Sequence, residues 1–296
     1  AIPPAEQLLP ADTLFVVCAP DGNNLRAAYQ KSVPSQLWND PAMKPFREKF
    51  VAKWTEEFVK PLERDLGVKF DDYSALLQGQ LTFAVTQDGW QGAEKNDGNP
   101  AFLILLDAKE KGDLLKKNLA ELRKKWSDAG KPIRTEKIRD VDFFAVALNT
   151  NDTPKTLRQF FPQRQPIEEL GKTTAKSSEQ AELLIGQHQS LLIIGSSIPA
   201  LEKVVARLTG AAAPALAENP VFAADQVAVF RDAPLFGWFN ARLVFDLVLR
   251  RPEEPPNPAA PNPLPLPPLG KTLSATGLQG LKSLAVAFRN PGDGTQ

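Results

Sequence analysis

The chain has 296 residues, with 35 basic and 35 acidic side chains and 43% hydrophobic residues. This length and apolar content suit one large or two medium globular domains. Because the charges cancel, no global field favours nucleic acid, anionic lipid or a polyacidic substrate, and any such partner requires a local patch. The sequence also contains no run of about 18 apolar residues, the length needed to span a bilayer.

Strands and amphipathic helices alternate along the first half of the chain. The apolar run Thr13–Ala19 predicts a buried strand, and a helix is expected over residues 24–31. Apolar side chains recur at every fourth position from Phe46 to Leu66, which predicts a long helix whose apolar stripe winds slowly around it. Further buried strands are expected at Leu81–Val85 and Ala101–Leu106.

The middle of the chain continues this alternation. Asp113 is expected to cap a helix with an apolar face, and residues 133–148 are expected to form a hairpin that turns near Arg139. Residues 149–180 are polar, with one short helix expected near Leu157–Phe161.

The stretch Ala181–Gly210 shows the architecture most clearly. Two apolar runs, Leu183–Ile185 and Leu191–Ile194, are too short for helices and are joined by a polar turn, which predicts a hairpin. Ser196 and Ser197 then offer N-cap oxygens, and the glycine that closes the stretch suits the left-handed end of a helix. This helix is expected to lay its apolar face across the hairpin.

A short motif indicates an internal duplication. The triplet Leu-Gln-Gly precedes an apolar strand in both Ala75–Val85 and Gly277–Phe288. Upstream of each triplet lies another apolar strand that feeds a helix, at Leu14–Ala19 and at Leu235–Phe239. Chance similarity between strand-forming segments is the alternative, because the shared triplet is short.

The duplication predicts two units of unequal length. Residues 1–226 are expected to form a complete first α+β unit, and residues 227–296 the beginning of a second, incomplete copy. We therefore expect the natural protein to continue past Gln296. Nine of the seventeen residues from 252 to 268 are proline, which predicts an extended loop, with an SH3-type ligand as the alternative.

Together these elements predict an α+β fold. Because the strands follow one another through short turns, we expect largely antiparallel sheets, with helices packed on one face and internally duplicated strand–helix units.

The residue types on which common active sites depend are scarce. His188 is the only histidine and falls in a polar turn, where a solvated side chain is expected rather than a catalytic base. Cys18 is the only cysteine and is expected to be a small core residue, so a zinc site has too few ligands. The sequence contains no Gly-x-Ser-x-Gly and no Ser-x-x-Lys motif.

Two Gly-Lys-Thr triplets also fail as phosphate loops. A phosphate loop needs a glycine five positions before the triplet, so that backbone amides can surround the phosphate. In this chain those positions hold Pro166 and Pro265.

Carboxylates are therefore the main candidates for catalysis. The adjacent pairs at 71–72, 168–169 and 253–254 point apart on a helix or strand, so capping and solvation are their expected roles. Basic residues exceed acidic ones between Asp107 and Arg139 and are interpreted as the solvated face of a helix, and no nucleic-acid binding is expected.

Trp90 is the remaining candidate for a binding role. It lies in a loop rich in Gly, Asn and Asp, and it is expected to fold back on the domain, with an exposed binding anchor as the alternative. We assign no catalytic, cofactor-binding or metal-binding residue from the sequence, and no cofactor.

Four segments carry a resemblance to known proteins: LLPADTLFVV, LWNDPAM, LLQGQLTFAV and GQHQSLLIIGSS. With these segments the chain resembles an uncharacterised family of bacterial envelope proteins that is defined by a domain of unknown function. The resemblance implies an exported, duplicated α+β protein. Its motifs are structural turns and strands, so it implies no catalytic residues.

The first residues, AIPPAEQLLPAD, are typical of what remains after a signal peptide has been removed. We therefore expect an extracytoplasmic location, periplasmic or secreted, with a trimmed cytosolic chain as the alternative. The leading hypothesis is a non-catalytic binding or envelope-associated structural protein, with a protein or an envelope component as partner.

Two alternatives remain open. A carboxylate-dependent hydrolase, for example one acting on glycosides, requires two carboxylates roughly 5 to 10 Å apart in a concave cleft. A soluble carrier of an apolar ligand requires a large apolar pocket.

Overall fold

The computed structural model describes residues 1–60, 63–64, 69, 73–88, 100–148, 181–249 and 275–289. The predictions for Trp90, for 149–180, for the proline-rich loop 252–268 and for the three adjacent carboxylate pairs lie outside these residues. The helices and strands are α1 Ala5–Leu8, β1 Thr13–Ala19, α2 Gly22–Lys31, α3 Val33–Asn39, α4 Lys44–Trp54, β2 Leu81–Thr86, β3 Ala101–Asp107, α7 Gly112–Asp128, β4 Ile133–Ile138, β5 Val141–Leu148, β6 Ala181–His188, β7 Leu191–Gly195, α9 Ile198–Leu208, α10 Pro220–Asp225, β8 Leu235–Phe239, α11 Ala241–Leu249 and β9 Leu284–Phe288.

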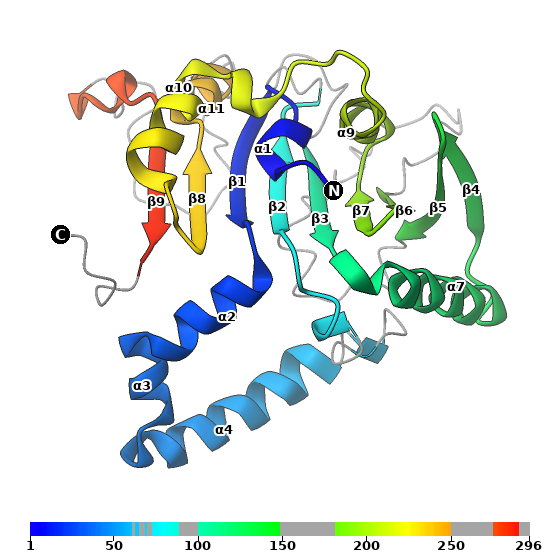
Figure 1. Ribbon diagram of the computed structural model, residues 1–296, viewed down its shortest axis with the longest axis horizontal. Helices are drawn as coiled ribbons and strands as arrows, with labels where there is room; N and C mark the ends of the chain where they lie inside the picture. The colour runs from blue at the N-terminus through cyan, green and yellow to red at the C-terminus, as the bar shows by residue number, and fades with distance from the viewer. Residues whose placement is uncertain are drawn as a thin grey trace, which may run out of the picture.

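Within the described residues, nine strands form one sheet in the order β4-β5-β6-β7-β3-β2-β1-β8-β9 (Figure 1). Every neighbouring pair is antiparallel. The α+β class and the antiparallel arrangement predicted from the sequence are confirmed.

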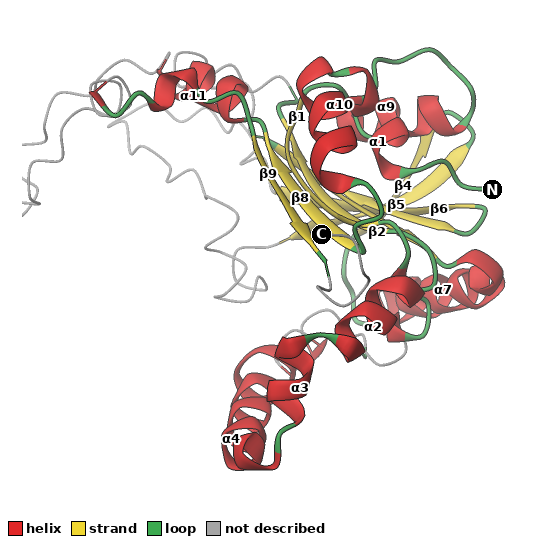
Figure 2. Ribbon diagram, turned by 60° about the vertical axis from the view of Figure 1, so that its left-hand side comes forward, coloured by secondary structure: helices red, strands yellow, loops and turns green. Residues whose placement is uncertain are grey.

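Helices cover both faces of this sheet, which corrects the expectation that they pack on one face. On β7, Ile193 is buried in a cluster with Leu201 and Val204 of α9, whereas the adjacent Leu192 is buried in a second cluster with Leu115 of α7. Successive side chains of a strand point to opposite faces, so the two clusters lie on opposite sides of the sheet. Figure 2 shows α1, α9 and α10 on one side and α7 on the other.

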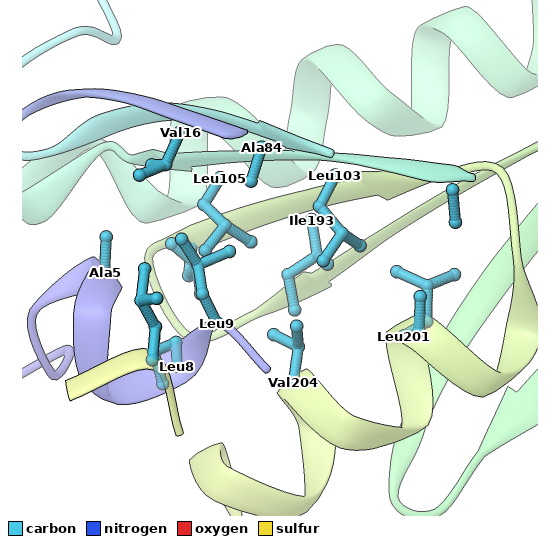
Figure 3. Close-up of a cluster of buried hydrophobic side chains, with 14 of the residues drawn as sticks. Ala5, Leu8, Leu9, Val16, Ala84, Leu103, Leu105, Ile193, Leu201 and Val204 are labelled. Carbon is cyan, nitrogen blue, oxygen red and sulfur yellow. The ribbon is translucent and has the colours of Figure 1, made fainter. Parts of the chain in front are cut away.

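The unit predicted over 181–210 is confirmed. The β6–β7 hairpin leads into α9, the Ser197 side chain accepts a hydrogen bond from the Ala200 backbone N–H, and Gly210 has a φ of +80°. Leu201 and Val204 of α9 face Leu103 and Ile193 of the sheet (Figure 3). The helix start predicted at Asp113 differs slightly, because α7 begins at Gly112 and Asp113 lies in its first turn.

The two segments proposed as repeats lie in equivalent places. β1 pairs with β2, β8 pairs with β9, and β1 pairs with β8, so one end of the sheet reads β2-β1-β8-β9. The Gly22 N–H donates to the Gly79 carbonyl at 2.7 Å, and the Arg242 N–H donates to the Lys282 carbonyl at 3.2 Å. The donors Gly22 and Arg242 each lie three residues after the end of a strand, β1 and β8 respectively. The acceptors Gly79 and Lys282 each lie two residues before the start of the next strand, β2 and β9 respectively.

The Leu-Gln-Gly triplets themselves are offset by two residues in this alignment. Gly79 lies two residues before β2, whereas Gly280 lies four residues before β9. The proposed division at residues 226 and 227 falls inside a continuous helical segment, because a π-helical turn, Gln226–Phe230, follows α10 directly. That division stays a prediction.

The two edges of the sheet differ in chemistry. β4 has the sequence IRTEKI, and its Arg134 forms ion pairs with Glu136 and Glu182. β9 has the sequence LAVAF and carries no charge, and its Val286 is 68% exposed. Charged side chains on an edge strand discourage pairing with further strands. Only the β4 edge has this protection.

Two tryptophans allow a test of where the core ends. Trp238 of β8 is 1% exposed and donates through Nε1 to the Asp225 carboxylate at 2.9 Å, whereas Trp54 of α4 is 49% exposed. We expect Trp238→Ala to lower the free energy of unfolding by roughly 3 to 5 kcal/mol, because it leaves a cavity and removes one of the two hydrogen bonds that Asp225 Oδ2 accepts, the other coming from the Ser283 hydroxyl. Trp54→Ala serves as the matched control and should cost under about 1 kcal/mol. Equal losses in urea unfolding would contradict this assignment.

Candidate functional site

An arm made of α2, α3 and α4 leaves the sheet at the end of β1 (Figure 1). Side-chain caps begin α2, α3 and the short 3₁₀ turn Pro41–Met43 that leads into α4. Asp21 accepts from the Asn24 N–H, Ser32 from the Ser35 N–H, and Asp40 from the Ala42 N–H. The sequence therefore breaks the arm into short helices at defined points, and α3 and α4 come to lie farthest from the sheet (Figure 2).

Polar contacts fix the root of the arm. Arg26 donates through Nη2 to the carbonyls of Ser74 at 3.0 Å and Leu77 at 2.6 Å, and Lys109 pairs with Asp21. Burial alone raises the pKa of the Asp21 carboxyl, but Lys109 and backbone N–H donors outweigh this and hold the pKa below its usual value. This pair therefore stabilises the fold at neutral pH and loses its effect as the pH falls through that lowered pKa.

The described part of the arm contributes nothing to either hydrophobic cluster. No side chain from Pro20 to Val59 belongs to the two buried clusters. In α4 no residue is buried, and in α3 only Ser35 is. The apolar side chains of the arm are thus not explained by the core of the sheet.

Five aromatic side chains form a continuous row on the arm, which we call the aromatic ladder: Trp38, Phe46, Phe50, Trp54 and Phe58. Phe46, Phe50 and Trp54 are 55%, 47% and 49% exposed. The ring of Trp38 in α3 meets the rings of Phe46 and Phe50 edge-on, which joins the two helices. The ladder is the largest group of exposed aromatic residues in the described part of the chain.

A π-helical turn, Thr55–Val59, keeps the ladder straight. In an α-helix, residues four apart are offset by about 40°, so a stripe with this spacing winds around the helix. The wider π turn reverses this offset at the end of α4. As a result the rings of Trp54 and Phe58 are the closest neighbours in the ladder, with centroids 4.6 Å apart.

The rings in the ladder are closely spaced. Successive rings from Phe46 to Phe58 are nearly parallel, with interplanar angles of 23°, 11° and 18°. Flat ligands such as nucleobases bind by stacking on a free ring face. Here neighbouring centroids are 6.0, 6.2 and 4.6 Å apart, which leaves too little room for a flat ligand between two rings, so the ladder presents an apolar surface rather than a set of stacking slots.

A cavity of about 690 Å³ brings together carboxylates that sequence analysis could not place. Its lining includes Glu6, Asp107 and Asp232, together with Cys18 and Phe230. Glu6 accepts a hydrogen bond from the side-chain amide of Gln226 at 2.8 Å. Asp107 Oδ1 accepts from the Ser190 hydroxyl at 2.6 Å and from the Lys109 N–H at 2.9 Å. The hydrogen bonds of Glu6 and Asp107 thus connect separate structural elements.

Cys18 is buried beside this cavity. Burial raises the pKa of its thiol to about 12, although the Thr82 hydroxyl, which donates to Sγ at 3.2 Å, acts in the opposite direction. A thiol with this pKa carries almost no thiolate at neutral pH and is a poor nucleophile.

His188 is the last residue of β6 rather than part of the turn, and it is half-buried. It lines a second cavity of about 920 Å³ with Asp113, Asp140 and Asp142. In the described ranges no group of three His, Cys, Asp or Glu side chains is placed to hold a metal ion. Within the same ranges, none of the helices has the length and apolar character that crossing a membrane requires.

The ladder was not identified as a site from the sequence, which predicted only an apolar stripe on a long helix. One signal was present, because the stripe from Phe46 to Phe58 consists entirely of Phe and Trp. Comparison with family models, with curated proteins and with solved structures gave no match to this chain. The resemblance to bacterial envelope proteins stays a prediction.

Thiol labelling provides a test of the cavity. We expect Cys18 in the folded protein to resist a disulfide reagent at pH 8, because its raised pKa and its burial both suppress the reactive thiolate. The same reagent should label one thiol per chain in urea. Rapid labelling of the folded protein would show that the cavity is open to Sγ and that the pKa is not raised.

Proposed function

We propose that this protein is a non-catalytic, extracytoplasmic binding protein that associates with the cell envelope through its aromatic ladder. The observation that carries this proposal is the exposure of Phe46, Phe50 and Trp54 on an arm outside both buried clusters. Large contiguous apolar patches on a soluble surface commonly mark interaction sites.

The energetic cost of this arrangement supports a binding role. Leaving large aromatic side chains half-exposed forfeits about 1 kcal/mol or more for each one, relative to full burial. Trp126 and Trp238 show that the same chain buries tryptophan where its fold requires it. The arm instead holds its rings outward, with caps and a π turn that keep them in one row.

The hydrolase alternative has less support. It requires two carboxylates that are free to exchange protons and to contact a substrate. In the first cavity, Glu6 is bonded to Gln226, and Asp107 to Ser190 and Lys109. These contacts favour a structural role for both carboxylates.

The carrier alternative requires an apolar pocket. The first cavity mixes apolar residues such as Phe230 and Phe236 with Glu6 and Lys109. The second is lined by several charged side chains, among them Asp113, Arg123 and Asp142. The charged side chains make both cavities poorly suited to an apolar ligand, whereas the ladder is well suited to contact with an apolar surface.

A triple variant, Phe46→Ser/Phe50→Ser/Trp54→Ser, tests the proposal. We expect the wild-type protein, exported to the periplasm of a bacterial host, to appear in the envelope fraction, and the variant to appear in the soluble periplasmic fraction. The physical reason is that the variant removes the exposed apolar surface without changing the core.

The matched control replaces three exposed apolar residues elsewhere: Leu114→Ser, Val227→Ser and Val286→Ser. It should distribute like the wild type, and circular dichroism should show that both variants are folded. Retention of the ladder variant in the envelope fraction would refute the proposed role of the arm.

A further inference from the structure

We infer that the envelope component bound by the aromatic ladder is the surface of an anionic lipid bilayer. This inference rests on the proposed function and names its partner. Three observations carry it: the spacing and exposure of the rings, the charge beside them, and the position of the arm.

The rings of the ladder are half-exposed and closely spaced. Because neighbouring centroids are 4.6 to 6.2 Å apart, a flat sugar or a base cannot enter between two rings. The exposed parts of the rings can instead enter the disordered hydrocarbon near the headgroups, where no matching surface is needed. Tryptophan is enriched at this depth because its ring is amphipathic. Trp38 and Trp54 are the two members of the ladder that have this property.

The charge around the ladder complements anionic headgroups. Residues 44–60 carry five basic and three acidic side chains, whereas the whole chain has no net charge. Lys49 and Lys53 lie three positions after Phe46 and Phe50, so they flank the ladder along one side of α4. A lysine stem can lie along apolar surface while its ammonium group reaches a phosphate.

Acidic side chains only partly offset this charge. Lys53 lies 3.7 Å from Glu57, and Lys44 lies 3.9 Å from Glu48, with all four side chains more than half exposed. Exposed pairs of this kind are weak and can exchange their partner for a lipid phosphate. The side of α4 that carries Lys49 therefore remains attractive to an anionic surface.

The place of the arm suits contact with a surface. α3 and α4 are the elements farthest from the sheet in both ribbon views (Figures 1 and 2). The ladder from Phe46 to Phe58 spans about 18 Å of helix, at 1.5 Å per residue. A helix of this length can lie in the interface with one face buried, as amphipathic surface helices do.

Vesicle sedimentation tests this inference with the full chain. We expect binding to mixed phosphatidylcholine–phosphatidylglycerol vesicles at low salt, and weaker binding to phosphatidylcholine alone. Raising the salt concentration should weaken the binding to mixed vesicles by screening the charge. Phe46→Ser/Phe50→Ser/Trp54→Ser should abolish binding to both kinds of vesicle.

The charge contribution has its own matched pair of variants. Lys49→Gln/Lys53→Gln should weaken binding to the mixed vesicles by roughly tenfold or more, and leave binding to phosphatidylcholine alone nearly unchanged. Lys124→Gln/Lys125→Gln on α7 removes the same charge far from the ladder and should behave like the wild type. Equal effects of the two variants would overturn the inference.

The outcomes separate this inference from the proposed function. Retention in the envelope fraction that depends on the ladder, without any vesicle binding, would overturn the lipid assignment and leave the proposed function standing. Self-association that depends on the ladder in the absence of vesicles, seen by sedimentation velocity, would equally overturn it in favour of a second copy. Quenching of Trp54 by brominated lipid, reduced in Trp54→Phe while binding persists, would support it directly.

Discussion

The antiparallel pairing of β1 with β8 is the contact on which the rest of the structure depends. It joins Phe15 to Phe239 and Cys18 to Phe236, and thereby links strands that are more than 200 residues apart in the sequence. β2 and β9 then pair on the outer sides of these two strands, so the β2-β1-β8-β9 end of the sheet has an approximate twofold arrangement. One backbone hydrogen-bonded layer thus holds both halves of the chain, and separate cores for each half are not needed.

This arrangement also decides where the helical segments leave the sheet. β1 and β8 run in opposite directions, so α2 departs from one end of this strand pair and α11 from the other (Figure 1). The arm is therefore an insertion between β1 and β2, held at its root by Arg26 and by the pairing of Asp21 with Lys109. A firmly attached root and an apolar far end fit the attachment role that we propose for the arm.

The sequence allowed good prediction of local structure and poor prediction of long-range arrangement. The bounds of β1 and the unit ending at Gly210 follow from short apolar runs, caps and a left-handed glycine, which are local signals. The placement of helices on both faces could not be predicted. A run such as Thr13–Ala19 is apolar on both faces of the strand, so it does not indicate which face a helix covers. The ladder had the same ambiguity. The sequence pattern of a stripe from Phe46 to Phe58 is the same whether the stripe packs on a sheet or faces solvent.

The contrast between the edge strands has a consequence for how such a sheet can grow. At β4, the charged side chains of Arg134 and Lys137 disfavour pairing with a further strand. At β9, the run Leu284–Phe288 carries no charge, so this strand has no such protection of its own. In the described part of the sheet, resistance to an added strand is therefore unequal at the two edges, and an extended segment from elsewhere would meet less of it beside β9.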